Sequence, residues 1–257
     1  MSASNESFFK TVLIAVSLCL VCSVLVTSSA VILKDKQKSN ALLDKKRNVL
    51  IAANLYKEGI DIEQAFASID QQFVDLKSGQ LVELENAVSY DQRKAAKNIE
   101  TSHKPQKDIA RIGRQANIAS IYLVKGEQGI ESIILPVHGK GLFSTMYGFL
   151  AIKSDKKTVI GLKFYEQGET PGLGGEVENP KWLALWQDKQ LFDDKGNLAL
   201  ELVKGSAQNQ YQIDALSGAT MTTRGLQNMI DFWLGEEGFG PFLSQLQTNQ
   251  LVKKAGA

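Results

Sequence analysis

The stretch Ile118-Ala-Ser-Ile-Tyr-Leu-Val-Lys125 opens a series of four β-rich segments that decides the fold of this chain. The next three are residues 131–137, 146–153 and 159–166, all rich in β-branched and aromatic side chains. Glycines and the Ser-Asp-Lys-Lys turn at residues 154–157 separate the four segments. We therefore expect an antiparallel meander, the core of an α+β domain.

Helical patterns flank these strands. Apolar spacing predicts helices over residues 34–60 and 62–76, with Asp61 placed to cap the second helix, and a helical turn over residues 91–97. Behind the strands we predict a short helix, a further strand, a longer helix and a last short helix, at residues 180–189, 198–204, 222–234 and 241–246. The fold class is thus α+β, an antiparallel sheet flanked by helices.

The N-terminal region contains an apolar run, Thr11–Leu33, without a charged residue. As a helix it would be roughly 34 Å long, enough to cross a bilayer. Ser28-Ser29-Ala30 resembles a signal-peptidase site, so cleavage is the alternative, but the run continues past Ala30 and we favour a retained anchor. We predict a tail (1–10), a single transmembrane helix (11–33), a mainly helical stalk and packing region (34–117) and an α+β domain (118–257).

Flanking charge points to a cytoplasmic location for the large C-terminal part. Lysine or arginine occupies positions 34, 36, 38, 45, 46 and 47, whereas Lys10 is the one such residue before the span. The positive-inside rule places the more basic flank in the cytoplasm, although long domains often cross the membrane despite such charge.

The composition excludes several classes of function. The 257 residues carry a net charge of +1 without a long basic run, which argues against a nucleic-acid partner. Cys19 and Cys22 both lie in the apolar run, where we interpret them as membrane-facing filler rather than a metal or redox pair. His103 and His138 are far apart, so no metal site is predicted. No nucleophile motif or acid/base pair stands out, which suggests that a bound cofactor supplies any chemistry.

The segment Asp214-Ala-Leu-Ser-Gly-Ala-Thr-Met-Thr-Thr223 is a candidate phosphate site. It places Thr220 after a turn of small residues and before an apolar-periodic helix. The first amides of a helix bind phosphate well, because they lack partners and the helix dipole favours negative charge there. The alternative is structural, with Ser217 or Thr220 simply capping the helix.

A glycine-rich loop, Glu169-Thr-Pro-Gly-Leu-Gly-Gly175, follows the last strand of the meander. It lacks the Lys-Ser/Thr of a Walker loop, and Val177 stands where a dinucleotide-binding fingerprint needs its third glycine. A flat ligand could lie against its backbone and Leu173. The alternative is an ordinary turn.

These segments resemble those of a known family. Asp-x-x-Ser-Gly-Ala-Thr resembles the sequence recognised by flavin transferases, which join FMN through its phosphate to the last threonine, here Thr220. The 169–175 loop resembles the second signature of FMN-binding domains. With the N-terminal anchor and residues 138–147 (HGKGLFSTMY), the whole chain resembles the C subunits of Na⁺-translocating NADH:quinone oxidoreductases. The G subunits of Rnf electron-transport complexes are the nearest alternative, but residues 141–147 and the long helical insert favour the former.

The resemblance implies a flavoprotein subunit that relays single electrons through FMN joined covalently to Thr220, with no catalytic residue of its own. Glu169 and Thr170 would orient the loop, and Asp214 would be part of the transferase recognition sequence. The expected cofactor-binding residues are Ser217, Gly218, Ala219, Glu169, Thr170, Gly172, Leu173, Gly174, Lys204, Thr222 and Thr223.

The resemblance also implies partners and a location. The partners are the other subunits of a membrane oxidoreductase, a flavin transferase during maturation and the lipid bilayer. The soluble part, with residues 118–257 as its FMN-binding domain, would be periplasmic at a bacterial inner membrane, against the charge count. The short tail of residues 1–10 would be cytoplasmic. Two rival functions are a cofactor-free anchored assembly module and a flavoenzyme with its own small-molecule substrate.

Overall fold

The computed structural model describes residues 8–126 and 129–246, so positions 1–7 of the predicted N-terminal tail lie outside the described residues. The chain divides into two compact units, Met1–Lys45 and Lys46–Ala257. The described part of the first unit consists of helix α1 (Phe8–Ala52). The last turns of this helix, from residue 46 on, belong to the second unit.

Helix α1 extends well beyond the predicted membrane span. No glycine or proline occurs between residues 11 and 52, so nothing breaks the helix at the end of the apolar run. The predicted helix at 34–60 is its continuation, and it ends at Ala52, before Asn54 adopts a left-handed backbone with φ 57°. Among the described residues, α1 is the one helix long and apolar enough to cross a membrane, and it exposes the free thiols of Cys19 and Cys22.

A six-stranded antiparallel sheet forms the centre of the second unit. Its strand order is β2-β1-β5-β6-β7-β8, so the four predicted strands of the meander are neighbours, as expected. The strands are β1 (Ile69–Asp75), β2 (Leu81–Val82), β5 (Ile118–Gly126), β6 (Gly129–Lys140), β7 (Thr145–Lys153) and β8 (Val159–Glu166).

The prediction of one helix over residues 62–76 is wrong. Helix α2 covers only Ile62–Phe66, with Asp61 capping it as expected by accepting hydrogen bonds from two backbone amides. The chain then enters β1, which pairs with β5 along its whole length. A four-residue spacing puts Ile69 and Phe73 on one face of a strand as readily as on one face of a helix, and pairing with β5 decides between the two.

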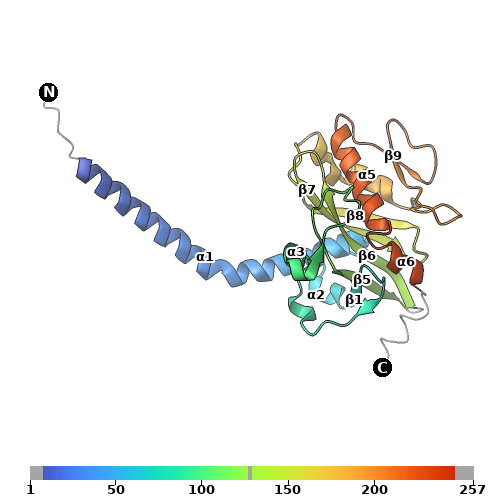
Figure 1. The fold of residues 1–257 in the computed structure, drawn as a ribbon, viewed down its shortest axis with the longest axis horizontal. Helices are drawn as coiled ribbons and strands as arrows, with labels where there is room; N and C mark the ends of the chain where they lie inside the picture. The colour runs from blue at the N-terminus through green and yellow to red at the C-terminus, as the bar shows by residue number, and fades with distance from the viewer. Residues whose placement is uncertain (1–7, 127–128, 247–257) are drawn as a thin grey trace. The chain divides into compact units, whose positions relative to one another are not determined.

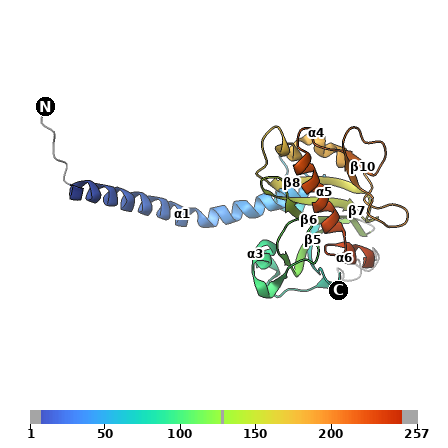
Figure 2. The same ribbon diagram turned by 45° about the horizontal axis from the view of Figure 1, so that its top comes forward.

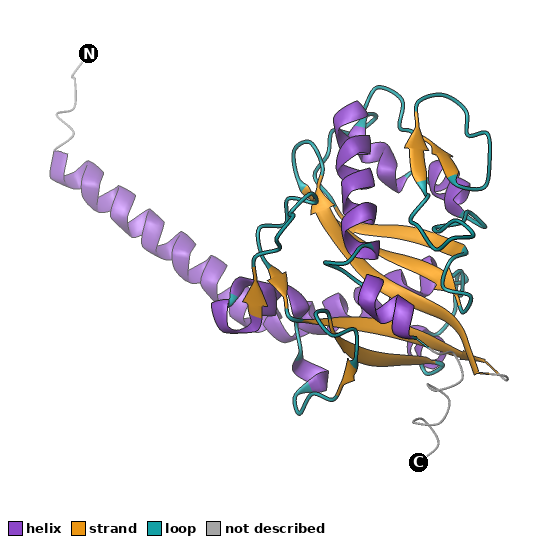
Figure 3. Ribbon diagram, turned by 45° about the vertical axis from the view of Figure 1, so that its right-hand side comes forward, coloured by secondary structure: helices purple, strands orange, loops and turns teal. Residues whose placement is uncertain are grey.

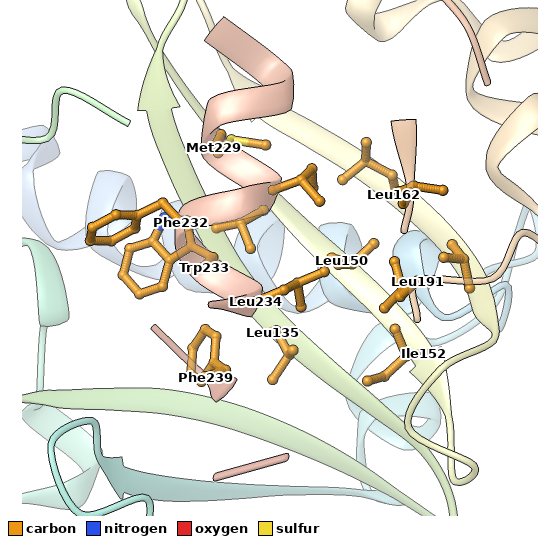
Figure 4. Packing of buried hydrophobic residues seen from close by; sticks show 14 of the residues in the cluster. Leu135, Leu150, Ile152, Leu162, Leu191, Met229, Phe232, Trp233, Leu234 and Phe239 are labelled. Carbon is orange, nitrogen blue, oxygen red and sulfur yellow. The ribbon is translucent and has the colours of Figure 1, made fainter. Parts of the chain in front are cut away.

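Helices cover both faces of the sheet. Helix α5 (Thr220–Leu234) lies over β6 on one face, where Met229, Trp233 and Leu234 pack in a cluster with Leu135 and Leu150 (Figure 1, Figure 2, Figure 4). The opposite face packs against the last turns of α1 and α2 in a second cluster, which includes Val49, Leu50, Ala52, Phe66, Tyr122, Ile134 and Phe149. The structure therefore confirms the predicted class, an antiparallel sheet flanked by helices.

The remaining elements are short. The predicted helix at 180–189 is α4 (Pro180–Leu183), which is capped by Asn179 and followed by a 3-10 turn. The strand expected at 198–204 is β9, which pairs in parallel with β10 and is separate from the main sheet (Figure 3). The other bounds are α3 (Gln92–Lys97), α6 (Gly240–Gln245), β3 (Ser102–His103), β4 (Gln115–Ala116), β9 (Glu201–Val203), β10 (Gln212–Asp214), η1 (Ala87–Ser89), η2 (Ile99–Thr101), η3 (Gly174–Glu178) and η4 (Ala184–Trp186). Strands β1 to β4 lie within the region expected to be mainly helical, and the domain boundary at residue 118 stays a prediction.

Candidate functional site

Three segments meet at the N-terminus of α5. The loop 141–144 joins β6 to β7, and the glycine-rich loop 169–175 follows β8. Because β6 and β8 are both antiparallel to β7, the two loops lie at the same end of the strands. Helix α5 closely approaches this end of the strands: a Cβ on Gly225 would lie only 2.3 Å from the carbonyl oxygen of Lys140. The turn 215–219 leads into α5 and brings the predicted attachment segment to the two loops.

Glu169 connects these segments through its buried carboxylate. Oε1 accepts hydrogen bonds from the amides of Phe143 (3.0 Å) and Ser144 (2.9 Å) and from the Ser144 hydroxyl (3.2 Å). Oε2 accepts from the amide of Leu142 (3.1 Å) and the hydroxyl of Thr222 (2.6 Å). Burial by itself raises the pKa of this carboxyl, but the hydrogen bonds from Thr222 and the three amides outweigh it and hold the pKa below its ordinary value.

The three threonines near the start of α5 lie in different environments. Thr222 is 1% exposed and donates its hydroxyl proton to Glu169, and Thr223 is 7% exposed and accepts a hydrogen bond from the amide of Leu216. Thr220, the first residue of α5, is exposed. Of the three threonines, Thr220 is therefore the one that is accessible to solvent.

Helix α5 begins without a capping side chain. Its N-cap residue is Ala219, and no side chain among the described residues makes the N-cap hydrogen bond. The alternative in which Ser217 or Thr220 caps this helix is therefore wrong. Backbone amides of the first turn lack intrahelical partners and carry the positive end of the helix dipole, which makes this end suitable for an anion.

Leu173 lies beside the small-residue turn. Gly218 has a positive φ of 71°, and a Cβ placed there would stand 3.2 Å from Cδ2 of Leu173. Leu173 is nevertheless 45% exposed, so part of its side chain remains available for an apolar contact. Gly174 is buried behind it, where a Cβ would come within 2.5 Å of the Thr222 hydroxyl oxygen.

Sequence reasoning missed three exposed apolar residues in these segments. Leu142 and Phe143, in the loop beside Glu169, are 45% and 63% exposed, and Met221, next to Thr220, is 47% exposed. The sequence singles out the segment 138–147 through its family resemblance alone. Two adjacent large apolar residues in a loop between strands are the signal that could have identified them.

The remaining predicted site residues are Thr170, Gly172, Asp214, Lys204 and Ser217, and the first three take part in loop structure. The Thr170 carbonyl accepts hydrogen bonds from the amides of Leu173 and Gly175, which closes the glycine-rich loop, and Gly172 has a positive φ of 75°. Asp214 accepts at Oδ1 from the amide of Ala207 (2.6 Å). Lys204 and Ser217 are exposed, and Lys204 directly follows β9, whose last residue pairs with Asp214.

Neither histidine belongs to this site. His103 pairs with Asn117 at 2.8 Å, and His138 stacks on Tyr147 and packs against Trp233. Burial, followed by repulsion from Arg93, lowers the pKa of His138 to about 4. Within the described part of the chain, no group of three or more histidine, cysteine or acidic residues is arranged to hold a metal ion. An open groove of about 620 Å³, lined by residues between Glu83 and Thr101, contains none of the predicted site residues.

Comparison with known proteins shows which family this chain resembles. The FMN-binding domain family matches residues 141–235, a range that contains the loop beside Glu169, the glycine-rich loop and all of α5. Over 256 residues, the chain is 45% identical to the C subunit of the Na⁺-translocating NADH-quinone reductase of Vibrio alginolyticus, covering 98% of this chain and 100% of that protein. The corresponding protein of Pseudomonas aeruginosa is 44% identical, over 96% and 99% of the two chains.

The chain belongs to the family of C subunits of Na⁺-translocating NADH-quinone reductases. The crystal structure of Shewanella oneidensis NqrC agrees with this assignment, with 43% identity, a TM-score of 0.74 and coverage of 82% of this chain and 97% of that one. The C subunit from Parabacteroides distasonis has 26% identity and a TM-score of 0.66, with coverage of 84% and 98%.

Membership of this family confirms the predicted resemblance and decides against the Rnf alternative. The chain is a flavoprotein subunit of a translocase complex and contains an FMN-binding domain. This finding also argues against the cofactor-free assembly module. The glycine-rich loop, the uncapped helix start and exposed Leu173 fit a phosphate and a flat ring, so the residues present are compatible with FMN.

Proposed function

We propose that Thr220 carries FMN through a phosphoester bond to its Oγ, and that the chain relays single electrons within a Na⁺-pumping NADH:quinone oxidoreductase. One observation carries the choice of residue: Thr220 is exposed at the start of α5, whereas Thr222 and Thr223 are buried and hydrogen-bonded to Glu169 and Leu216. A transferase needs an accessible hydroxyl, and Thr220 offers it.

Attachment is a phosphoryl transfer to the Thr220 hydroxyl. Its oxygen forms a bond to the phosphorus of an activated flavin phosphate held by the transferase, the bond from phosphorus to the leaving group breaks, and the hydroxyl proton is released. The product is a phosphodiester with one negative charge. Amides of the uncapped first turn of α5, around Ala219, stabilise this charge, with about 0.3–1 kcal/mol from the helix dipole.

The neighbouring loops provide the surroundings of the flavin ring. Bound FMN supplies the one-electron chemistry, and the protein supplies position and electrostatics. Leu173 offers an apolar surface beside Gly218, and Gly172 and Gly174 allow close approach of the backbone. Lys204 and Ser217 are exposed and remain candidates for contacts with the phosphate or the ribityl chain.

We place residues 11–33 in the bacterial inner membrane as an anchor and the FMN-binding part in the periplasm, where the transferase and the other subunits reach it. Lys46 and Arg47, two of the residues that argue for the opposite topology, have roles in the folded unit. Lys46 pairs with Glu63 (2.5 Å), and the Arg47 guanidinium lies 4.9 Å from the ring centre of Tyr56. Both side chains therefore have a structural reason to be basic, which weakens the charge count.

Co-expression of the full chain with a flavin transferase tests the assignment. The wild type should fluoresce on a denaturing gel and gain the mass of one bound FMN, and Thr220→Ala should lose both properties. Thr220→Ser keeps a hydroxyl and serves as the conservative comparison, and Ser206→Ala, which removes an exposed hydroxyl outside the motif, should retain the flavin. Covalent flavin on Thr220→Ala would contradict the site.

A further inference from the structure

Every hydrogen-bond partner of the Glu169 carboxylate among the described residues is a donor. Three backbone amides of residues 142–144 and the hydroxyl groups of Ser144 and Thr222 point at its two oxygens, at distances of 2.6–3.2 Å. Glu169 is itself only 5% exposed. Both oxygens of an ionised carboxylate only accept hydrogen bonds, so together they can accept from all five donors. A glutamine would instead direct an NH₂ group, itself a donor, at two or more of these donors.

Two glycines make room for this carboxylate. A Cβ on Gly141 would lie 2.6 Å from Oε1 of Glu169, and a Cβ on Gly174 would lie 2.9 Å from Oε2. Any larger residue at either position would displace the carboxylate from the amides or from Thr222. The backbone is thus shaped around the charged side chain from two sides.

The carboxylate also determines which groups the site presents outward. The amides of Leu142 and Phe143 donate to Glu169, while the side chains of the same two residues are 45% and 63% exposed. Thr222 is held two residues along the helix from Thr220. One buried anion therefore fixes the 141–144 loop, the glycine-rich loop and the first turn of α5 relative to one another.

We propose that Glu169 is a positioning residue for the flavin, acting through Thr222 and the 142–144 amides to hold Thr220 and Leu173 in the arrangement that attachment and electron transfer require. This inference rests on the proposed attachment of FMN to Thr220. It assigns Glu169 no contact with the cofactor, which differs from its expected place among the cofactor-binding residues. It also gives Thr222 a role in supporting the loop instead of contacting the phosphate.

The test is the rate of flavin attachment to the purified full chain in detergent, with transferase and flavin donor, followed by fluorescence on denaturing gels. We expect Glu169→Gln to slow attachment at least tenfold and Thr222→Val to slow it several-fold, with Thr222→Ser restoring most of the rate. Glu176→Gln is the matched control, because the Glu176 carboxylate lies in the next turn and bonds to Asn179 instead of α5. Attachment to Glu169→Gln at the wild-type rate would overturn the proposal.

Two further measurements separate positioning from folding. Hydrogen exchange of the amides of residues 142–144 should accelerate in Glu169→Gln and Thr222→Val, while exchange in β6 and β7 stays at the wild-type level. The midpoint potential of attached flavin should rise in Glu169→Gln, because removal of a nearby negative charge favours electron uptake. If Glu169→Gln does not fold, a wild-type rate for Thr222→Val overturns the proposal. If wild-type protein takes up no covalent flavin, the attachment site is wrong, and amide exchange still tests the link to Glu169.

Discussion

Cδ2 of Leu173 lies 3.2 Å from the position that a Cβ on Gly218 would occupy, so a side chain at Gly218 would require Leu173 of the glycine-rich loop to shift. Gly218 also has a φ of 71°, a conformation that costs other residues about 1–2 kcal/mol. Gly218→Ala should therefore lower the free energy of unfolding by about 2 kcal/mol in urea titrations of the full chain in detergent, and it should slow flavin attachment.

Gly196→Ala provides the matched control for that substitution. Gly196 has a similar φ of 83°, but no atom lies within 4 Å of its added Cβ, so the backbone strain is the same and the steric contact is missing. The difference between the two variants isolates the contact with Leu173. Equal losses of stability, with unchanged attachment in both, would show that this contact is unimportant.

Gly225 gives a prediction in which packing opposes helix propensity. An alanine inside a helix is normally about 1 kcal/mol more favourable than a glycine. At Gly225, however, the added Cβ would lie 2.3 Å from the Lys140 carbonyl oxygen and 3.0 Å from the Cα of Gly141. Both neighbours are backbone atoms, so overpacking should prevail and Gly225→Ala should destabilise the fold by about 1–3 kcal/mol.

Thermal and urea unfolding of the full chain measure this effect, with Arg224→Ala as control. Arg224 is the preceding, exposed residue of α5, and its replacement should change stability by no more than about 0.5 kcal/mol. A stability of Gly225→Ala at or above that of the wild type would mean that α5 shifts away from β6 at little cost.

His138 makes the stability of the fold depend on pH. The ring is packed against Tyr147 and Trp233, and its pKa falls from an ordinary 6.5 to about 4. The unfolded chain therefore binds a proton at higher pH than the native chain, so this contribution to stability is complete above the unfolded pKa and is lost as the pH falls toward the folded pKa. Between about pH 7.5 and pH 4.5 the loss should be about 2–3 kcal/mol.

Replacement of His138 by phenylalanine retains an aromatic ring and removes the titration. Free energies of unfolding at the two pH values should then differ less for His138→Phe than for the wild type, by about 2–3 kcal/mol. The comparison concerns the pH-dependent difference alone, because the substitution also changes packing against Trp233. Identical differences in the two proteins would contradict the role of His138.

Local patterns predict the meander and α5, and nonlocal pairing explains what they miss. The four strands between residues 118 and 166 follow one another and pair with sequence neighbours, so apolar runs and turns are sufficient to find them. Strand β1 pairs with β5 about fifty residues later, and no local pattern shows that partner. The helical spacing over residues 62–76 is consequently misleading, because the strand depends on a distant segment.

The site is predictable to a similar extent. The motif around Thr220 and the 169–175 loop can be named from the sequence, because each is contiguous. The partners of Glu169 cannot, since Leu142, Phe143 and Ser144 lie in a loop about 25 residues before it and Thr222 lies 53 residues after it. The sequence thus indicates a loop that faces the cofactor, whereas the structure turns the Glu169 carboxylate of this loop inward, toward residues 142–144 and Thr222.

Leu173 provides a final prediction about the proposed flavin ring. If its exposed side chain packs on the ring, Leu173→Ser should slow covalent attachment without preventing its completion, and it should release the attached ring from that surface. Flavin fluorescence anisotropy of the attached protein should then fall, with little change in unfolding free energy, because the leucine is already 45% exposed. Leu185→Ser is the matched control, since Leu185 is 40% exposed in η4 and outside the three segments of the site. Equal anisotropy for wild type and Leu173→Ser would mean that the ring packs against other residues, of which Leu142, Phe143 and Met221 are the exposed apolar ones in these segments.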